Sequence, residues 1–159
     1  YDADGVGDPD ELPEGARSEP SYNACLDLSA GLFGWLDRLR ATEADQDARH
    51  PFIWAVRNGA SAVERSYAPD LKPGTIGGQL ALLTEGQGHL VEALGLLDVL
   101  VGKAGMTPGA YIRLRELVQA ARDAALDRYV QLREVYAGYR ERAIRVLGAA
   151  FDNPTSEEI

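Results

Sequence analysis

The chain of 159 residues contains one cysteine and two histidines, and each scarcity excludes a class of site. A single cysteine, Cys25, rules out an internal disulfide and a zinc site built from cysteines. The two-metal centres of helical bundles use a Glu-x-x-His motif from each of two helices, and this chain, with only His50 and His89, offers the reversed order His89-x-x-Glu92 once. We therefore predict no metal site, and the low cysteine content favours a cytoplasmic location.

Long apolar runs and catalytic signature motifs are also missing. No stretch approaches the ~18 uninterrupted apolar residues that a membrane-spanning helix needs, and no basic segment followed by an apolar run resembles a signal peptide. No Gly-x-Ser-x-Gly motif occurs, and the glycine-rich residues 74–78 lack the lysine and preceding strand of a phosphate loop. These absences predict a soluble protein without a membrane partner, and they give little support to an enzyme.

Acidic residues exceed basic ones, and the two kinds are unevenly distributed. The net charge is −9 with a pI near 4.7, which argues against a nucleic-acid partner because phosphate binding needs a dominant basic face. Residues 1–21 hold seven acids and one arginine, whereas residues 111–151 hold eight arginines and five acids. We predict that residues 1–20 form a flexible, solvated acidic leader, with electrostatic shielding of the last helix as the alternative. Residues 152–159 are expected to form a flexible tail.

Apolar residues recur at steps of three and four, which predicts amphipathic helices and no strands. The first helix is expected from Ser21 to about Leu39, and the second begins with Pro51 in its first turn, where a missing N–H costs nothing. The third is expected over 75–103 and the fourth over 109–151. Short connections favour a single all-α domain over 21–151, folded as an antiparallel four-helix bundle with a long C-terminal helix.

The predicted last helix is longer than its neighbours can cover. About 42 residues span roughly 63 Å, whereas helices of 20 to 29 residues span roughly 30 to 44 Å. The helix must therefore overhang the bundle or bend, and Gly138 is the expected bend site because glycine weakens a helix interior. An overhang exposes an apolar stripe that a partner would cover, most simply a second copy. The candidate interface residues are Val135, Tyr139, Ala143, Val146 and Leu147.

Polar residues interrupt the apolar third helix at LTEGQGHL, residues 83–90. At 100° per residue Glu85 faces water, His89 borders the apolar sector and Gln87 points inward, so a metal cluster is not expected. Small residues occupy one flank of the same helix, and we expect this strip to allow close packing of a neighbouring helix rather than to leave room for a ligand. The strip contains Gly77, Ala81, Thr84, Gly88, Gly95 and Gly102.

Arginine and tyrosine residues border the core stripe of the last helix. The favoured interpretation is that the arginine stems cover apolar surface while their charged ends reach water or pair with acids. The alternative is a pocket between the third and fourth helices that binds a small acidic or aromatic ligand, since guanidinium groups bind carboxylates in a fork. His89 would then act as an acid or base or, less favoured, as a haem ligand; no other cofactor is predicted. The candidate ligand-binding residues are Gln87, His89, Arg122, Tyr129, Tyr136 and Arg140.

The leading hypothesis from the sequence is thus an interaction or accessory protein that works through self-association or a protein partner, by way of its last helix. The ligand-binding bundle is the second hypothesis.

Overall fold

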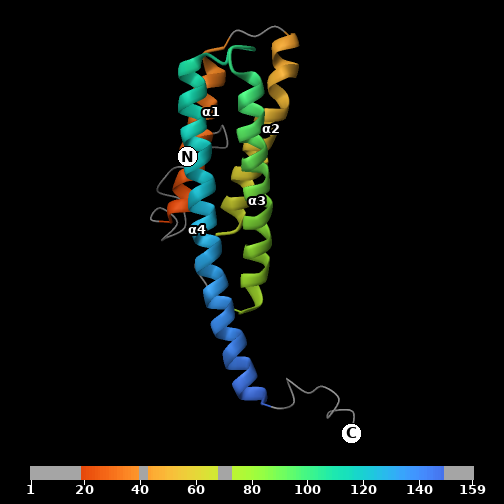
Figure 1. Ribbon diagram of the computed structural model, residues 1–159, viewed down its shortest axis with the longest axis vertical. Helices are drawn as coiled ribbons and strands as arrows, with labels where there is room; N and C mark the ends of the chain where they lie inside the picture. The colour runs from red at the N-terminus through yellow and green to blue at the C-terminus, as the bar shows by residue number, and fades with distance from the viewer. Residues whose placement is uncertain (1–18, 40–42, 68–72, 149–159) are drawn as a thin grey trace, which may run out of the picture.

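The structure, a computed structural model, describes residues 19–39, 43–67 and 73–148, and all regular structure within them is α-helical. The four helices are α1 (Pro20–Asp37), α2 (Glu43–Arg65), α3 (Pro73–Leu100) and α4 (Pro108–Leu147). The predicted all-α four-helix fold is confirmed. In Figure 1 α1 and α3 run in one direction, and α2 and α4 run in the other. Residues 1–18 of the predicted leader and the whole predicted tail, 152–159, lie outside the described residues.

The core forms where each helix packs on two neighbours. α1 packs on α2 and α4, and α3 packs on the same two helices from the other side. The aromatic centre of the core is Phe52 on α2, which is fully buried. Fully buried apolar residues on α3 and α4 include Ile76, Leu83, Leu90, Leu97, Val118, Ala121 and Ala125.

Two helices begin at capping residues that the local sequence supplies. The Glu19 carboxylate accepts a hydrogen bond from the Ser21 backbone N–H at 3.1 Å, and Pro20 occupies the first position of α1. Thr107 caps α4 in the same way, accepting from the Ala110 N–H at 3.1 Å. The sequence pattern places Glu19 in the acidic leader, yet the structure makes it the start of the folded bundle.

The predicted start of the second helix is wrong. α2 begins at Glu43, two turns before Pro51, so Pro51 lies inside the helix rather than in its first turn. A proline there cannot donate to the carbonyl of Asp47 and costs helix stability. Arg49 lies in these first two turns and stabilises them. Its side chain is buried against the α3–α4 connection, and its Nη1 donates to the Ala104 carbonyl at 2.9 Å.

α4 is an overhanging helix, and it ends sooner than predicted. Its 40 residues span about 60 Å, and Figure 1 shows its blue C-terminal part continuing beyond the N-terminal end of α3. The helix ends at Leu147 rather than at 151, because Gly148 adopts a φ of 58° that leaves the helical region. α4 runs without interruption through Gly138, the expected bend site. We call residues 133–147 the overhang.

The expectation that the small-residue strip of the third helix allows close packing is wrong. A Cβ added at Gly77, Gly88 or Gly95 would meet nothing within 4 Å, so this flank of α3 faces open space. Close helix contact is made instead by Gly59 on α2 and Gly86 on α3. A Cβ at either position would lie 3.2 Å or less from the other glycine's carbonyl oxygen.

The single thiol lies in the core and is expected to be chemically silent. Cys25 is fully buried, and burial, with a smaller effect from the Glu64 carboxylate, raises the pKa of the thiol from 9.0 to about 12. A disulfide reagent such as DTNB should therefore leave the folded protein unlabelled at pH 8 and label one thiol per chain in urea. Rapid labelling without denaturant would contradict this placement.

Candidate functional site

The six candidate ligand-binding residues do not converge on one site. Gln87, Arg122 and Tyr129 are half-buried, whereas Tyr136 and Arg140 are exposed. No hydrogen bond or ion pair joins any two of the six within the part of the chain that the structure describes. The guanidinium of Arg133, rather than that of Arg122 or Arg140, lies over the Tyr129 ring, 5.9 Å from its centre.

His89 lies at the border of the apolar sector, as its position in the sequence predicts. It is half-buried, and its ring meets the Trp54 ring of α2 edge to face, with 5.1 Å between the ring centres. Glu85 and Glu92 are exposed, and Glu85 lies 3.9 Å from Arg65. Among the described residues, no three His, Cys, Asp or Glu side chains are grouped so that they could hold a metal ion.

A buried arginine that the sequence did not reveal connects all four helices. Arg128 on α4 is 9% exposed; its Nη1 donates to Glu19 Oε2 at 2.9 Å, and its Nη2 donates to Gln79 Oε1 on α3 at 3.4 Å. The guanidinium also lies over the ring of Tyr67, just after α2, at 5.6 Å. Because the charge is enclosed with a carboxylate, an amide and a ring, this cluster is a structural clamp near the N-terminal end of α1.

A second buried arginine holds the opposite end of the bundle. The guanidinium of Arg49 lies 5.7 Å from the centre of the Trp35 ring, and the Trp35 indole N–H donates to the Gly105 carbonyl at 3.2 Å. Both side chains thereby fix the α3–α4 connection, in which Ala104 and Gly105 have positive φ values of 49° and 81°. A helical wheel places arginines at the margin of a core, but it cannot show which of them find partners inside it.

The side chain of Glu64 on α2 is partly buried, and it makes no hydrogen bond or ion pair within the described segments. Desolvation by burial raises its pKa above the ordinary 4.5. Its carboxylate adds to the effect of burial in raising the pKa values of Tyr22 and Cys25. The folded chain therefore loses stability as the pH rises through the interval between the unfolded and folded pKa values of Glu64.

We expect Glu64→Gln to be more stable than the parent chain at pH 7, with the gain vanishing below about pH 4.5. The test compares urea unfolding of both chains at pH 4 and pH 7. Using the difference between two chains removes the contribution of every other titrating group. Equal midpoints at pH 7, or a less stable Glu64→Gln chain there, would contradict the assignment.

The overhang brings the candidate interface residues together on one exposed helix face. Leu132, 3% exposed, is the last buried residue of α4. Val135 is half-buried and packs against the core, and Ala143 is also half-buried. The large apolar side chains beyond Leu132 are exposed to the following extents: Tyr136 47%, Tyr139 37%, Val146 77% and Leu147 53%.

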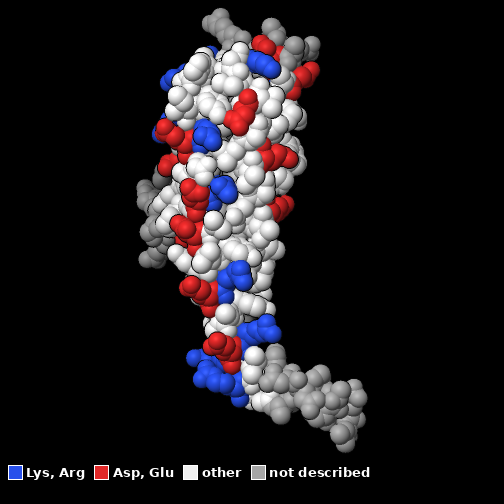
Figure 2. Space-filling model, viewed as in Figure 1, with Lys and Arg blue, Asp and Glu red and all other residues white. Residues whose placement is uncertain are grey.

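The spacing of these residues is that of a coiled-coil face. From Leu132 the stripe advances by four, three, four and three residues, which is the heptad pattern of helices that pair along a shared line. The members are Leu132, Tyr136, Tyr139, Ala143 and Val146. Four arginines and two glutamates accompany them in the overhang, and Figure 2 shows basic side chains concentrated around this end of α4.

Comparison with known proteins finds no match to the chain among family models, curated proteins or solved structures. None of the four described helices has the length and apolar character required to cross a membrane.

Proposed function

We propose that this protein is a helical-bundle interaction protein that self-associates through the overhang of α4. The observation that carries the proposal is the apolar heptad stripe, exposed at Tyr136, Tyr139 and Val146, on a helix that extends about 22 Å past Leu132, its last buried residue. Beyond Leu132 the large apolar side chains of the stripe keep 37–77% of their surface exposed, which is the surface that a partner would bury.

A second copy is the partner that the stripe favours. Two overhangs lying antiparallel place Tyr136 of each copy against Tyr139 of the other, and aromatic pairs stabilise such contacts. The arginines beside the stripe can stack on these rings, as Arg133 already does on Tyr129. Each overhang carries four arginines and two glutamates, so the apolar and aromatic contacts must exceed the repulsion between two basic segments.

The magnitudes fit a reversible dimer. Each copy offers four exposed large apolar side chains, and complete burial of one contributes about 1.5–3 kcal/mol. Association costs about 4–15 kcal/mol in lost freedom of motion. Because the eight side chains of a symmetric dimer are only 37–77% exposed in the single chain, their burial contributes an amount of the same order as that cost, so we expect weak, reversible association at micromolar or higher concentrations.

Light scattering tests the proposal on the intact chain. The mass is expected to rise from 17.2 kDa towards twice that value across micromolar concentrations. A constant monomer mass over this range, together with failure to recover any helical partner, would refute it.

A further inference from the structure

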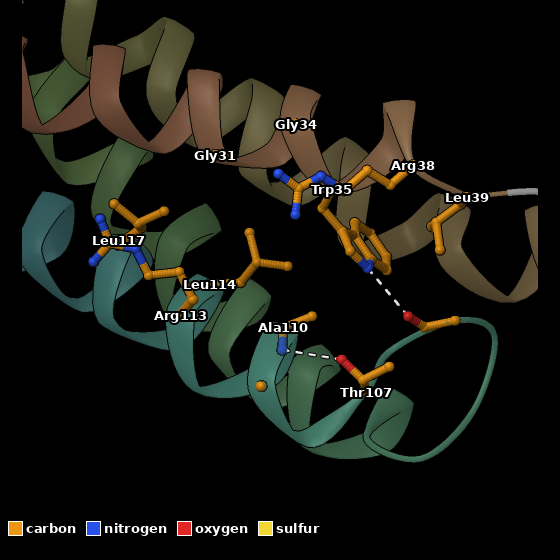
Figure 3. A pocket seen from close by; sticks show the side chains of 12 residues that line it. Gly31, Gly34, Trp35, Arg38, Leu39, Thr107, Ala110, Arg113, Leu114 and Leu117 are labelled. Atoms are coloured by element: carbon orange, nitrogen blue, oxygen red, sulfur yellow. Dashed lines mark hydrogen bonds between the residues drawn. The ribbon is translucent and has the colours of Figure 1, made fainter.

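A cavity of about 520 Å³ lies between α1 and α4, away from every candidate residue considered above. Its size falls within the roughly 300–1,000 Å³ typical of small-molecule sites. Figure 3 shows the cavity between the last two turns of α1 and the first turns of α4. Its apolar lining includes Trp35, Leu39, Leu114 and Leu117.

Two glycines open the cavity rather than close it. Gly34 on α1 and Gly109 on α4 both line it, and a Cβ added at either position would meet nothing within 4 Å. Glycine inside a helix costs about 1 kcal/mol relative to alanine, and close helix packing does not account for it at these positions. The missing side chains leave space for a flat group beside Trp35.

The mouth of the cavity carries the positive charge of Arg38. In Figure 3 the Arg38 side chain bends back from the end of α1 across the cavity near Trp35. Arg38 makes no ion pair with another described residue, whereas Arg113 on the opposite rim forms an exposed ion pair with Glu116 at 3.3 Å. The N-terminus of α4 at Gly109 adds a partial positive charge on the same side.

A second cation lies behind the cavity wall. Arg49 is 4% exposed and lies against the face of Trp35, yet its partners within the described chain are a carbonyl and a ring rather than a carboxylate. Its Nε has no hydrogen-bond partner among the described residues. An uncompensated buried charge is costly, and an anion bound nearby would lower that cost.

We propose that the α1–α4 cavity binds a small monoanion with a flat apolar body, of the class of aromatic carboxylates. The ring lies over Gly34 and beside Trp35, and the carboxylate pairs with Arg38 at the mouth. This site is independent of self-association, since none of its residues belongs to the overhang.

The probe for this site is 1-naphthoate, with 1-naphthamide as its neutral counterpart. Binding is read from the indole N–H signal of Trp35 in NMR spectra, which Trp54→Phe distinguishes from the only other indole signal. We expect naphthoate to shift this signal saturably and naphthamide to bind more weakly. No shift at millimolar naphthoate, or equal affinity for the two probes, would overturn the proposal.

Two variants test separately the contribution of the Arg38 charge and that of the space beside Gly34. Arg38→Gln should weaken naphthoate binding by about tenfold or more while leaving naphthamide unchanged, because one charge-assisted contact is lost. Gly34→Leu should abolish binding of both probes, whereas Gly95→Leu, at an exposed helical glycine outside the cavity, should not. Undiminished binding to a folded Gly34→Leu chain would contradict the site. If that chain does not fold, the Arg38→Gln result decides.

Discussion

Replacing Arg128 with alanine is expected to lower the free energy of unfolding by about 3–5 kcal/mol. The substitution leaves the Glu19 carboxylate, only 15% exposed, without its cation, and it leaves the Gln79 amide oxygen without its donor. It also removes the side chain that contacts segments from all four helices. Urea unfolding followed by circular dichroism measures the loss.

Arg122→Ala is the matched control for this prediction. Arg122 lies on the same helix and is half-buried, but it makes no hydrogen bond or ion pair within the described chain. Its removal should cost less than about 1 kcal/mol. The Glu19→Gln and Arg128→Ala substitutions should also combine with much less than additive loss, since they break one interaction. Equal losses in the Arg122 and Arg128 variants would show that the clamp does not stabilise the fold.

Replacing Tyr139 with glutamate is expected to weaken self-association by about a hundredfold or more. In the proposed dimer Tyr139 lies at the middle of the apolar stripe, and a symmetric interface buries the new charge twice. Tyr139 lies beyond Leu132, the last buried residue of α4, so the new carboxylate does not enter the core of the bundle. Light scattering gives the dissociation constant, and urea unfolding gives the stability of the chain.

Ala137→Glu is the control for the position of the charge. Ala137 lies two residues away on the same overhang but points away from the stripe, so the same added charge should leave association nearly unchanged. An equal loss in both variants would indicate a general effect of charge on the overhang. No loss in the Tyr139→Glu chain would mean that the partner surface lies elsewhere.

The sequence predicted those features of the fold that depend on the periodic spacing of apolar residues. Steps of three and four residues place Leu83, Leu90 and Leu97 on one face, and the structure buries all three. Length alone predicted that the last helix overhangs or bends, and in the structure the 40-residue α4 overhangs, since the longest other described helix contains 28 residues. These features depend only on the spacing of residues along one helix, which can be read directly from the sequence.

The features that periodicity missed all depend on tertiary contacts. In the sequence Arg49 and Arg128 occupy helix positions that are typical of surface arginines. Only the packed bundle supplies the carbonyl, the carboxylate and the aromatic rings that enclose them. Pro51 is a sound helix start by local rules, but the contacts of Arg49 keep the preceding turns helical. In the sequence Gly34 is only a residue that destabilises α1, and its position beside a cavity is seen only in the folded structure.

Dilution NMR of the unmodified, isotope-labelled protein tests the central claim most directly, because it locates the contact without a substitution. We expect concentration-dependent shifts to cluster on the overhang, at Tyr136, Tyr139, Val146 and Leu147. Other exposed apolar residues, such as Phe33 on α1 and Val99 on α3, should remain unchanged. Spectra that do not vary with concentration, or shifts centred on Phe33 or Val99 instead, would contradict self-association through α4.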